Sequence, residues 1–255
     1  MSAETLVIIS GASRGLGAAL ARLFVGEKAH VVTIARRADS ELIDLAQQHG
    51  ATLTALLADL ATDDGVRSSA DQITALLKQN AGTLQRVVLI NNAGSVDPVN
   101  VAQAQSDPQA ITQAFALNVS AALVLTAAVL SNVDTQVTAC QVLNISSGAG
   151  RNPSPGWSVY CATKAALDMA TRVLNVEQTG TNVRAVSLAP GVIDTEMQVN
   201  IRSHDTTRFP VREKFLALHA DGKLASPENV ALRIRQYLNR NDFGTIEIDD
   251  IRNYD

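Results

Sequence analysis

Short apolar runs alternate with longer amphipathic stretches along most of the chain, and this alternation restricts its fold more than any other feature. The apolar runs have the length of buried strands, and the stretches between them have helical spacing. We expect strands at residues 5–9, 30–35, 53–58, 87–90, 141–145, 183–188 and 245–248, and helices at 15–26, 41–49, 63–79, 109–130, 158–178 and 227–238. This order predicts an α/β fold, a Rossmann-type doubly wound parallel sheet of about seven strands with helices on both faces.

The chain contains no evident linker, repeat or low-complexity segment, so we expect a single domain over residues 1–255. Its 46% hydrophobic and 18% charged residues suit a globular protein with a sizeable core. Two helix starts have specific signals: Thr62 or Asp63 can cap the helix at 63–79, and Ser226 followed by Pro227 can begin the helix at 227–238. The pattern becomes irregular and charged after Ile193.

Charge and composition exclude several classes of function. A net charge of −4 gives no basis for a broad nucleic-acid surface. No apolar run approaches the ~20 residues of a membrane span, and the N-terminal apolar run is too short for a signal peptide. We therefore expect a cytoplasmic protein with no nucleic-acid or membrane partner.

Cysteine and histidine positions predict neither a disulfide framework nor a metal site. Cys140 and Cys161 are interpreted as reduced thiols. The histidines show no metal-ligand spacing, and each is interpreted as a surface or loop residue: His30, His49, His204 and His219.

A glycine-rich turn lies between the first predicted strand and the first predicted helix. It runs from Gly11 through Ser13, Arg14, Gly15 and Leu16 to Gly17, with the spacing G-x-x-x-G-x-G. Glycines permit a tight turn and let the backbone approach a pyrophosphate at a helix N-terminus. A packing role alone would also explain such glycines, but the strand–turn–helix context favours a dinucleotide.

The end of the second predicted strand indicates which dinucleotide binds. An NAD site has a carboxylate there for the ribose 2′-hydroxyl, whereas this chain has Arg36 and Arg37, with Asp39 as the nearest acid. Together with Arg14, these guanidinium groups suit a 2′-phosphate. The sequence therefore predicts NADP(H), unless the two arginines are simply solvated loop charges.

A second segment, residues 144–164, carries candidate catalytic groups. Ser147 follows a predicted strand, and Tyr160 and Lys164 are four residues apart on one helix face. A nearby ammonium favours the phenolate and should lower the tyrosine pKa from about 10. Tyr160 could then act as general acid towards a developing alkoxide, with Ser147 as a second donor to the same oxygen. A tyrosine and a lysine at this spacing are otherwise ordinary surface residues.

Together these motifs resemble the short-chain dehydrogenase/reductase family over nearly the whole chain. The resemblance rests on the glycine turn, Asp59, the Asn91-Asn92-Ala93-Gly94 segment, Asn118, the Ser147, Tyr160 and Lys164 set, and Pro190-Gly191 followed by Thr195. It implies that Asn118, Ser147, Tyr160 and Lys164 are catalytic, with Asn118 holding a water in a proton relay to Lys164.

The same resemblance assigns the cofactor contacts. Asp59 would contact adenine, Asn91, Ala93 and Gly94 would line the adenosine ribose, and Tyr160 and Lys164 would lie at the nicotinamide ribose. The nicotinamide would be capped by Pro190, Gly191, Ile193 and Thr195.

Within the family, the segments at 84–95, 116–120, 144–147, 156–169, 188–198 and 222–224 resemble the sepiapterin reductases and the benzil-type diketone reductases. This implies reduction of a vicinal diketone or a pterin side-chain ketone, under a substrate flap at residues 194–222. Trp157 and Met197 would line the pocket with Ser147 and Tyr160, and Asp249 would bind a pterin if it is the equivalent C-terminal carboxylate. An exposed acidic strand end is the alternative for Asp249.

Other functions stay open from the sequence. The chain could reduce a 3-oxoacyl group or another ketone, or could be a non-catalytic NADP-sensing protein, because one fold serves many functions. The family also implies a homodimer or a tetramer through the helices at 109–130 and 158–178. The sequence does not specify the physiological substrate, the stereochemistry or the preferred direction.

Overall fold

Seven parallel strands form one sheet in the computed structural model, which describes residues 5–27 and 29–254. Their order across the sheet is β3-β2-β1-β4-β5-β6-β7. The strands are β1 (Thr5–Ser10), β2 (His30–Ala35), β3 (Leu53–Leu57), β4 (Arg86–Asn91), β5 (Ala139–Ile145), β6 (Val183–Ala189) and β7 (Ile248–Asp250). The order reverses between β1 and β4, which creates a crevice at the carboxyl ends of these strands.

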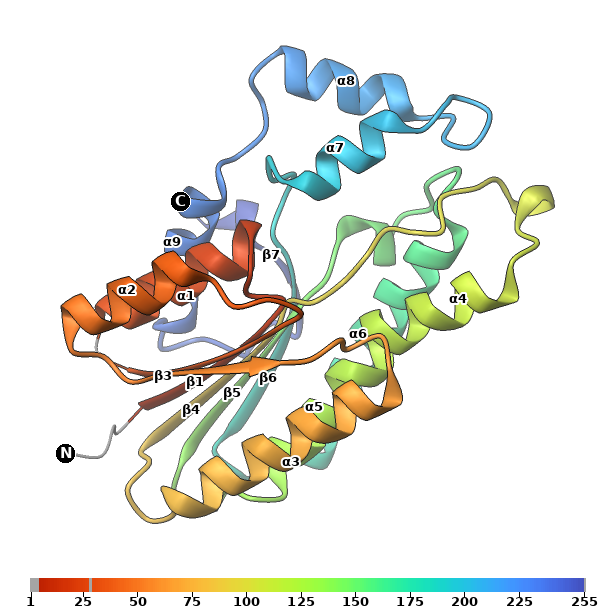
Figure 1. Ribbon diagram of the computed structural model, residues 1–255. Helices are drawn as coiled ribbons and strands as arrows, with labels where there is room; N and C mark the ends of the chain where they lie inside the picture. The colour runs from red at the N-terminus through yellow and green to blue at the C-terminus, as the bar shows by residue number, and fades with distance from the viewer. Residues whose placement is uncertain (1–4, 28, 255) are drawn as a thin grey trace.

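Helices cover both faces of the sheet, as the alternation predicted (Figure 1). They are α1 (Gly15–Gly26), α2 (Ser40–His49), α3 (Asp63–Gln79), α4 (Pro108–Phe115), α5 (Ala121–Leu130), α6 (Ser158–Glu177), α7 (Glu196–Ser203), α8 (Arg212–Ala220) and α9 (Pro227–Leu238). The helix α1 contacts α2 and α9 on one face, and α3 contacts α5 on the other. Predicted elements agree with these bounds within a few residues, apart from the last strand and the segment after 193.

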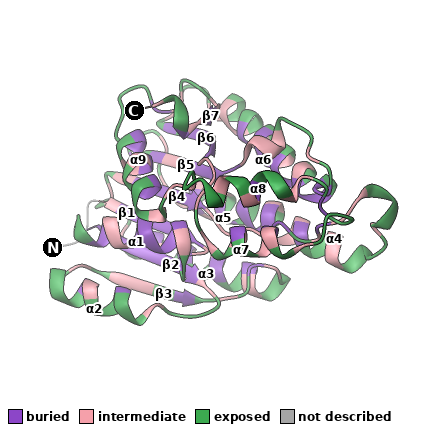
Figure 2. Ribbon diagram, turned by 90° about the horizontal axis from the view of Figure 1, so that it is seen from above, coloured by how far each residue is buried: buried purple, intermediate pink, exposed green. Residues whose placement is uncertain are grey.

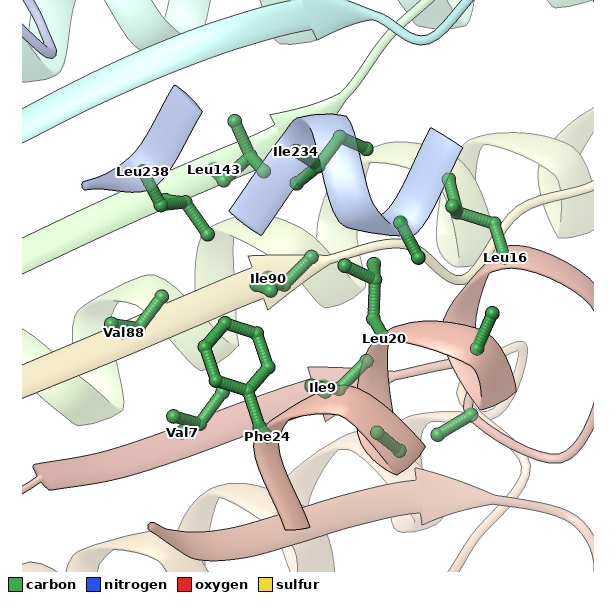
Figure 3. Close-up of a cluster of buried hydrophobic side chains, with 14 of the residues drawn as sticks. Val7, Ile9, Leu16, Leu20, Phe24, Val88, Ile90, Leu143, Ile234 and Leu238 are labelled. Carbon is green, nitrogen blue, oxygen red and sulfur yellow. The ribbon is translucent and has the colours of Figure 1, made fainter. Parts of the chain in front are cut away.

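Each face of the sheet has its own apolar core. On one face, side chains of α1 and α9 interlock with those of β1, β4 and β5, as Figure 3 shows for Leu20, Phe24, Ile90, Leu143 and Ile234. On the other face α3 and α5 pack against the same strands. The central strands β1, β2, β4, β5 and β6 are largely buried on both faces, which is why they are nearly continuous apolar runs (Figure 2).

Side-chain caps define several helix starts. The Thr62 hydroxyl accepts from the backbone N–H of Gly65 at the start of α3, and the Ser226 hydroxyl accepts from that of Asn229 at the start of α9. Both predicted caps are confirmed, with Thr62 chosen over Asp63. Such caps satisfy backbone donors that have no partner inside the helix.

The predicted helix at 109–130 is interrupted by a π-helical turn, Ala116–Ser120, between α4 and α5. By length and composition the stretch Pro108–Leu130 could cross a membrane, contrary to our expectation that no run reaches that length. In this fold the buried residues of α5 pack against α3 and β4, as those of a core helix do.

The segment at 194–222 is not irregular, because it forms α7 and α8 beyond the carboxyl edge of the sheet (Figure 1). Its two ends are joined where Asp194 donates to the carbonyl of Ala225 (2.9 Å). Two further expectations are wrong. The last strand is Ile248–Asp250 rather than 245–248, and His30 is buried on β2, where its Nε2 lies 2.9 Å from the Thr54 hydroxyl.

Candidate active site at the carboxyl edge of the sheet

A cleft of about 1350 Å³ runs along the carboxyl edge of the sheet, bounded by the glycine turn, the ends of the central strands and the flap helices α7 and α8. It is lined by these predicted cofactor residues: Gly11, Ser13, Arg14, Gly15, Leu16, Arg36, Asp59, Ala93, Gly94, Tyr160, Lys164, Pro190, Gly191, Ile193 and Thr195. One cavity therefore joins the dinucleotide motif to the catalytic candidates.

The glycine turn is held against the strand ends by close backbone contacts. Gly11 has φ +70 and donates to the carbonyl of Ile34 (2.8 Å). Behind the turn, a Cβ on Gly17 would lie 2.3 Å from the carbonyl oxygen of Gly11. Gly17 does not line the cleft, so its role is to let α1 pack under the turn rather than to touch a ligand.

Asn92 supports this turn, and sequence reasoning did not assign it a role of its own. Its side-chain amide donates to the carbonyls of Ser10 (3.0 Å) and Gly11 (3.1 Å). Asn92 also lines the cleft, whereas the predicted Asn91 does not, because the Asn91 amide turns inward to Asn144 Oδ1 (2.8 Å). Successive side chains at a strand end point in opposite directions, which explains why Asn92 lines the cleft and Asn91 does not.

Two of the three predicted arginines reach the cleft. Arg14 and Arg36 line it beside Asp59, whereas Arg37 is exposed and does not. The structure therefore brings Arg36 but not Arg37 to the cleft, and the predicted cofactor contact of Arg37 stays a prediction. Arg14 forms an ion pair with Glu196, the first residue of α7, so the glycine turn and the flap meet across the cleft.

Ser147, Tyr160 and Lys164 converge at the other end of the cleft. Ser147 follows β5, and its hydroxyl oxygen accepts from the backbone N–H of Ala149 (3.2 Å). Lys164 donates from Nζ to the carbonyl of Ile145 at the end of β5 (2.8 Å). The same ammonium lies 5.6 Å from the centre of the Tyr160 ring.

Burial dominates the acid–base state of both helix residues. It raises the pKa of Tyr160 to about 12, against a contact with Ser147 that lowers this pKa. Burial also lowers the pKa of Lys164 to about 8, against the charge of Asp168, which raises it. Our expectation of a lowered tyrosine pKa is therefore wrong, and Tyr160 stays protonated at neutral pH.

Asn118 lies in the π-helical turn and is buried. Its side-chain oxygen accepts from the backbone N–H of Ser95 (2.8 Å), and its amide donates to the carbonyl of Ser95 (2.8 Å) and the hydroxyl of Thr163 (3.1 Å). These bonds fix the loop beyond Gly94 to α6. Asn118 does not itself line the cleft, and π-helical turns are frequent at functional sites.

An aromatic cluster forms the wall of the cleft beside Tyr160. Trp157 stands edge-on to Tyr160 with ring centres 5.4 Å apart, and it packs against Phe209 (4.9 Å) and Phe215 (5.2 Å). Trp157, Met197 and Phe215 line the cleft, so two of the predicted substrate residues lie where we expected them. The flap supplies this wall because α7 and α8 fold over the catalytic end.

Asp249 lies elsewhere, and its predicted contact with substrate is wrong. It is buried beside α9, where its carboxylate accepts from the hydroxyls of Tyr237 (2.7 Å) and Tyr254 (2.5 Å). It does not line the cleft. Of the C-terminal tail, Arg252 reaches the cleft, and it is paired with Asp250.

No group of three or more metal-binding side chains is found within residues 5–27 and 29–254. Both cysteines are free; Cys140 is buried and Cys161 is partly buried.

Comparison with known proteins agrees with this geometry. Residues 5–206 match the model of the short chain dehydrogenase family. A benzil reductase ((S)-benzoin forming) of Bacillus cereus is 36% identical over 244 residues, which cover 95% of this chain and 97% of the relative. A sepiapterin reductase of Meriones unguiculatus is 35% identical over 246 residues, 92% of each chain. A solved short-chain dehydrogenase/reductase from Burkholderia vietnamiensis superposes with a TM-score of 0.67 at 32% identity, over 100% of both chains.

Proposed function

The chain belongs to the short-chain dehydrogenase/reductase family, and from this premise we propose that it is an NADPH-dependent carbonyl reductase acting on a vicinal diketone. The observation that carries the proposal is the convergence of Tyr160, Ser147 and Lys164 in one cleft with the glycine turn. A non-catalytic NADP sensor would need the turn but not this set of proton donors.

The cleft fits a nicotinamide dinucleotide. The glycines of the turn leave backbone accessible at the N-terminus of α1, where backbone N–H groups and the helix dipole would stabilise a pyrophosphate. Arg14 and Arg36 supply positive charge at the same end. When bound, the cofactor would supply the hydride, and the remaining chemistry belongs to the side chains.

Each catalytic side chain has a distinct task in this proposal. Ser147 donates a hydrogen bond to the carbonyl oxygen and polarises the C=O bond, keeping its own proton. Tyr160 transfers its phenolic proton to that oxygen as negative charge develops, and its protonated state at neutral pH suits a general acid. Lys164 stabilises the resulting phenolate with its ammonium group, and Asn118 holds the loop at Gly94 beside that ammonium.

The walls of the pocket favour an aromatic diketone over a pterin. Trp157, Met197 and Phe215 offer apolar surface to a hydrophobic substituent. Asp249, the carboxylate predicted to bind a pterin, instead accepts from the hydroxyls of Tyr237 and Tyr254. Similarity to the benzil reductase of Bacillus cereus supports the same choice.

A substrate panel tests the proposal. NADPH oxidation should be measured at 340 nm with benzil, diacetyl, sepiapterin and a 3-oxoacyl thioester. We expect the highest kcat/KM with benzil. Faster turnover of the thioester would identify a 3-oxoacyl reductase instead, and tight NADPH binding with no turnover of any carbonyl would favour the sensor.

Cofactor choice can be tested with two neighbouring arginines. Arg36→Ala should weaken NADPH binding by about tenfold and leave NADH binding nearly unchanged, because the lost guanidinium would face only the 2′-phosphate. Arg37→Ala is the matched control, since Arg37 does not line the cleft. Equal losses in both variants, or an equal loss for NADH, would contradict the assignment. Fluorescence titration with each dinucleotide measures the two Kd values.

We also propose that the protein is a cytoplasmic homodimer. Apolar side chains of α5 and α6 are exposed on the single chain, namely Leu123, Val124, Met169, Val173 and Val176. Pairing of these helices with their copies would bury them. Light scattering should give the mass of a dimer or of a pair of dimers, and a 27.0 kDa species would contradict the proposal.

A further inference from the structure

One buried carboxylate beside the catalytic groups has no role in the mechanism above. Asp168 lies on α6 four residues after Lys164, so the two side chains leave the same face of the helix one turn apart. Asp168 is only 7% exposed. A carboxylate is rarely buried without strong partners, since its desolvation costs several kcal/mol.

The partners of Asp168 come from the ends of two strands. One carboxylate oxygen, Oδ1, accepts from the hydroxyl of Ser146 (2.6 Å) and from that of Ser187 (2.6 Å). Ser146 directly follows β5 and precedes the catalytic Ser147. Ser187 lies on β6, which leads to Pro190 and Gly191 at the cleft.

The other oxygen bonds to the loop between β5 and α6. Arg151 donates from Nε to Oδ2 of Asp168 (3.2 Å) and from Nη2 to the carbonyl of Ser187 (3.3 Å). Gly150, next to Arg151, packs so closely on α6 that a Cβ there would lie 2.9 Å from the backbone of Lys164. One carboxylate thus joins the catalytic helix, two strand ends and the serine loop.

Asp168 also bears on the charge of Lys164. Burial lowers the pKa of Lys164 to about 8, and Asp168 raises it. The titratable neighbours are few. Tyr160 and Asp168 belong to α6 itself. Arg151 forms an ion pair with Asp168, and the charge of Arg151 also lowers the pKa of Asp250 on β7. From β5, the carbonyl of Ile145 accepts from Nζ of Lys164 (2.8 Å).

We propose that Asp168 is a positioning residue of this active site, which holds the ends of β5 and β6 against α6 and keeps a negative charge one turn from Lys164. It touches neither the substrate nor the cofactor in this scheme. It acts by fixing where Ser147 lies relative to Tyr160 and by keeping Lys164 an ammonium ion. The proposal rests on the proposed reductase function for its kinetic consequence but not for its effect on Lys164.

The charge effect can be measured without any turnover. The chain has five lysines, so labelling with [ε-13C]lysine gives few resonances, and Lys164→Arg assigns the one of interest. In Asp168→Asn the negative charge is lost while burial remains, so the midpoint of the Lys164 titration should fall by about one pH unit. Asp168→Glu keeps the charge and should restore most of the midpoint.

Asp249→Asn is the matched control, because Asp249 is also a buried carboxylate with hydroxyl partners but does not line the cleft. It should lose comparable thermal stability and leave the Lys164 midpoint unchanged. An unchanged midpoint in Asp168→Asn, or an equal fall in Asp249→Asn, would overturn the proposal.

Kinetics then give the second readout. With benzil and NADPH, the basic limb of the kcat profile should move to lower pH in Asp168→Asn by the same amount as the Lys164 midpoint, with little change in KM for NADPH. If the basic limb of the kcat profile stayed in place while the Lys164 midpoint fell, the proposed effect of Asp168 on catalysis would be overturned. Absence of turnover in the unmodified protein would instead refute the reductase function, and the Lys164 titration would still decide the role of Asp168.

Discussion

Replacing Tyr160 with phenylalanine should lower kcat for carbonyl reduction by about 10²–10⁴-fold, the usual contribution of a positioned general acid. The variant keeps the ring that packs edge-on against Trp157 and removes only the hydroxyl. NADPH affinity should therefore change little, because the apolar wall and the glycine turn stay intact. Stopped assays of NADPH oxidation measure kcat, and fluorescence titration measures the Kd.

Tyr237→Phe is the control for this experiment. Tyr237 is also a buried tyrosine, and its hydroxyl bonds to Asp249 far from the catalytic groups in sequence. It should keep its turnover even if it loses stability. Full turnover in Tyr160→Phe would contradict the mechanism, whereas comparable loss in both variants would indicate a general effect of removing a buried hydroxyl.

Replacing Gly17 with alanine should abolish dinucleotide binding in the micromolar range and destabilise the fold by about 1–3 kcal/mol. The added Cβ would lie 2.3 Å from the carbonyl oxygen of Gly11 and 2.5 Å from the side-chain amide of Asn92. Either α1 or the turn must shift to relieve this overlap. Because the shift displaces the backbone that would hold the pyrophosphate, binding should suffer more than stability.

Gly26→Ala is the matched control, since Gly26 ends the same helix and a Cβ there meets nothing within 4 Å. It should be neutral or slightly stabilising, because alanine favours helix and has fewer unfolded conformations. Thermal unfolding and titration with NADPH measure both effects. Normal NADPH binding by Gly17→Ala would show that the glycine turn tolerates the added Cβ. It would contradict the view that close packing of α1 at Gly17 is needed for binding.

Local pattern was sufficient for the strands and helices that form the two cores. Runs such as Val7–Ile9 and the helix from Gly15 are determined by neighbours along the chain, so periodicity predicts them. The flap helices α7 and α8 were missed because their apolar residues are few and face the aromatic cluster around Trp157. Tertiary contacts, rather than local periodicity, stabilise such short helices.

The site shows the same division. The glycine turn, Ser147, Tyr160 and Lys164 were predicted from residue type and spacing, and the structure brings them together in one cleft. Arg37 and Asp249 could not be excluded from the sequence, since a side chain's direction depends on the packing around it.

The sequence by itself determined the succession of strands and helices along the chain, the glycine turn, and the set of Ser147, Tyr160 and Lys164. Each of these depends on short-range spacing. Only the tertiary structure decided which of the two strand-end arginines lines the cleft, that burial outweighs the contact with Ser147 in setting the pKa of Tyr160, and that Asp168 joins two strand ends to α6. These outcomes depend on desolvation and on contacts between residues distant in the chain, which no local pattern contains.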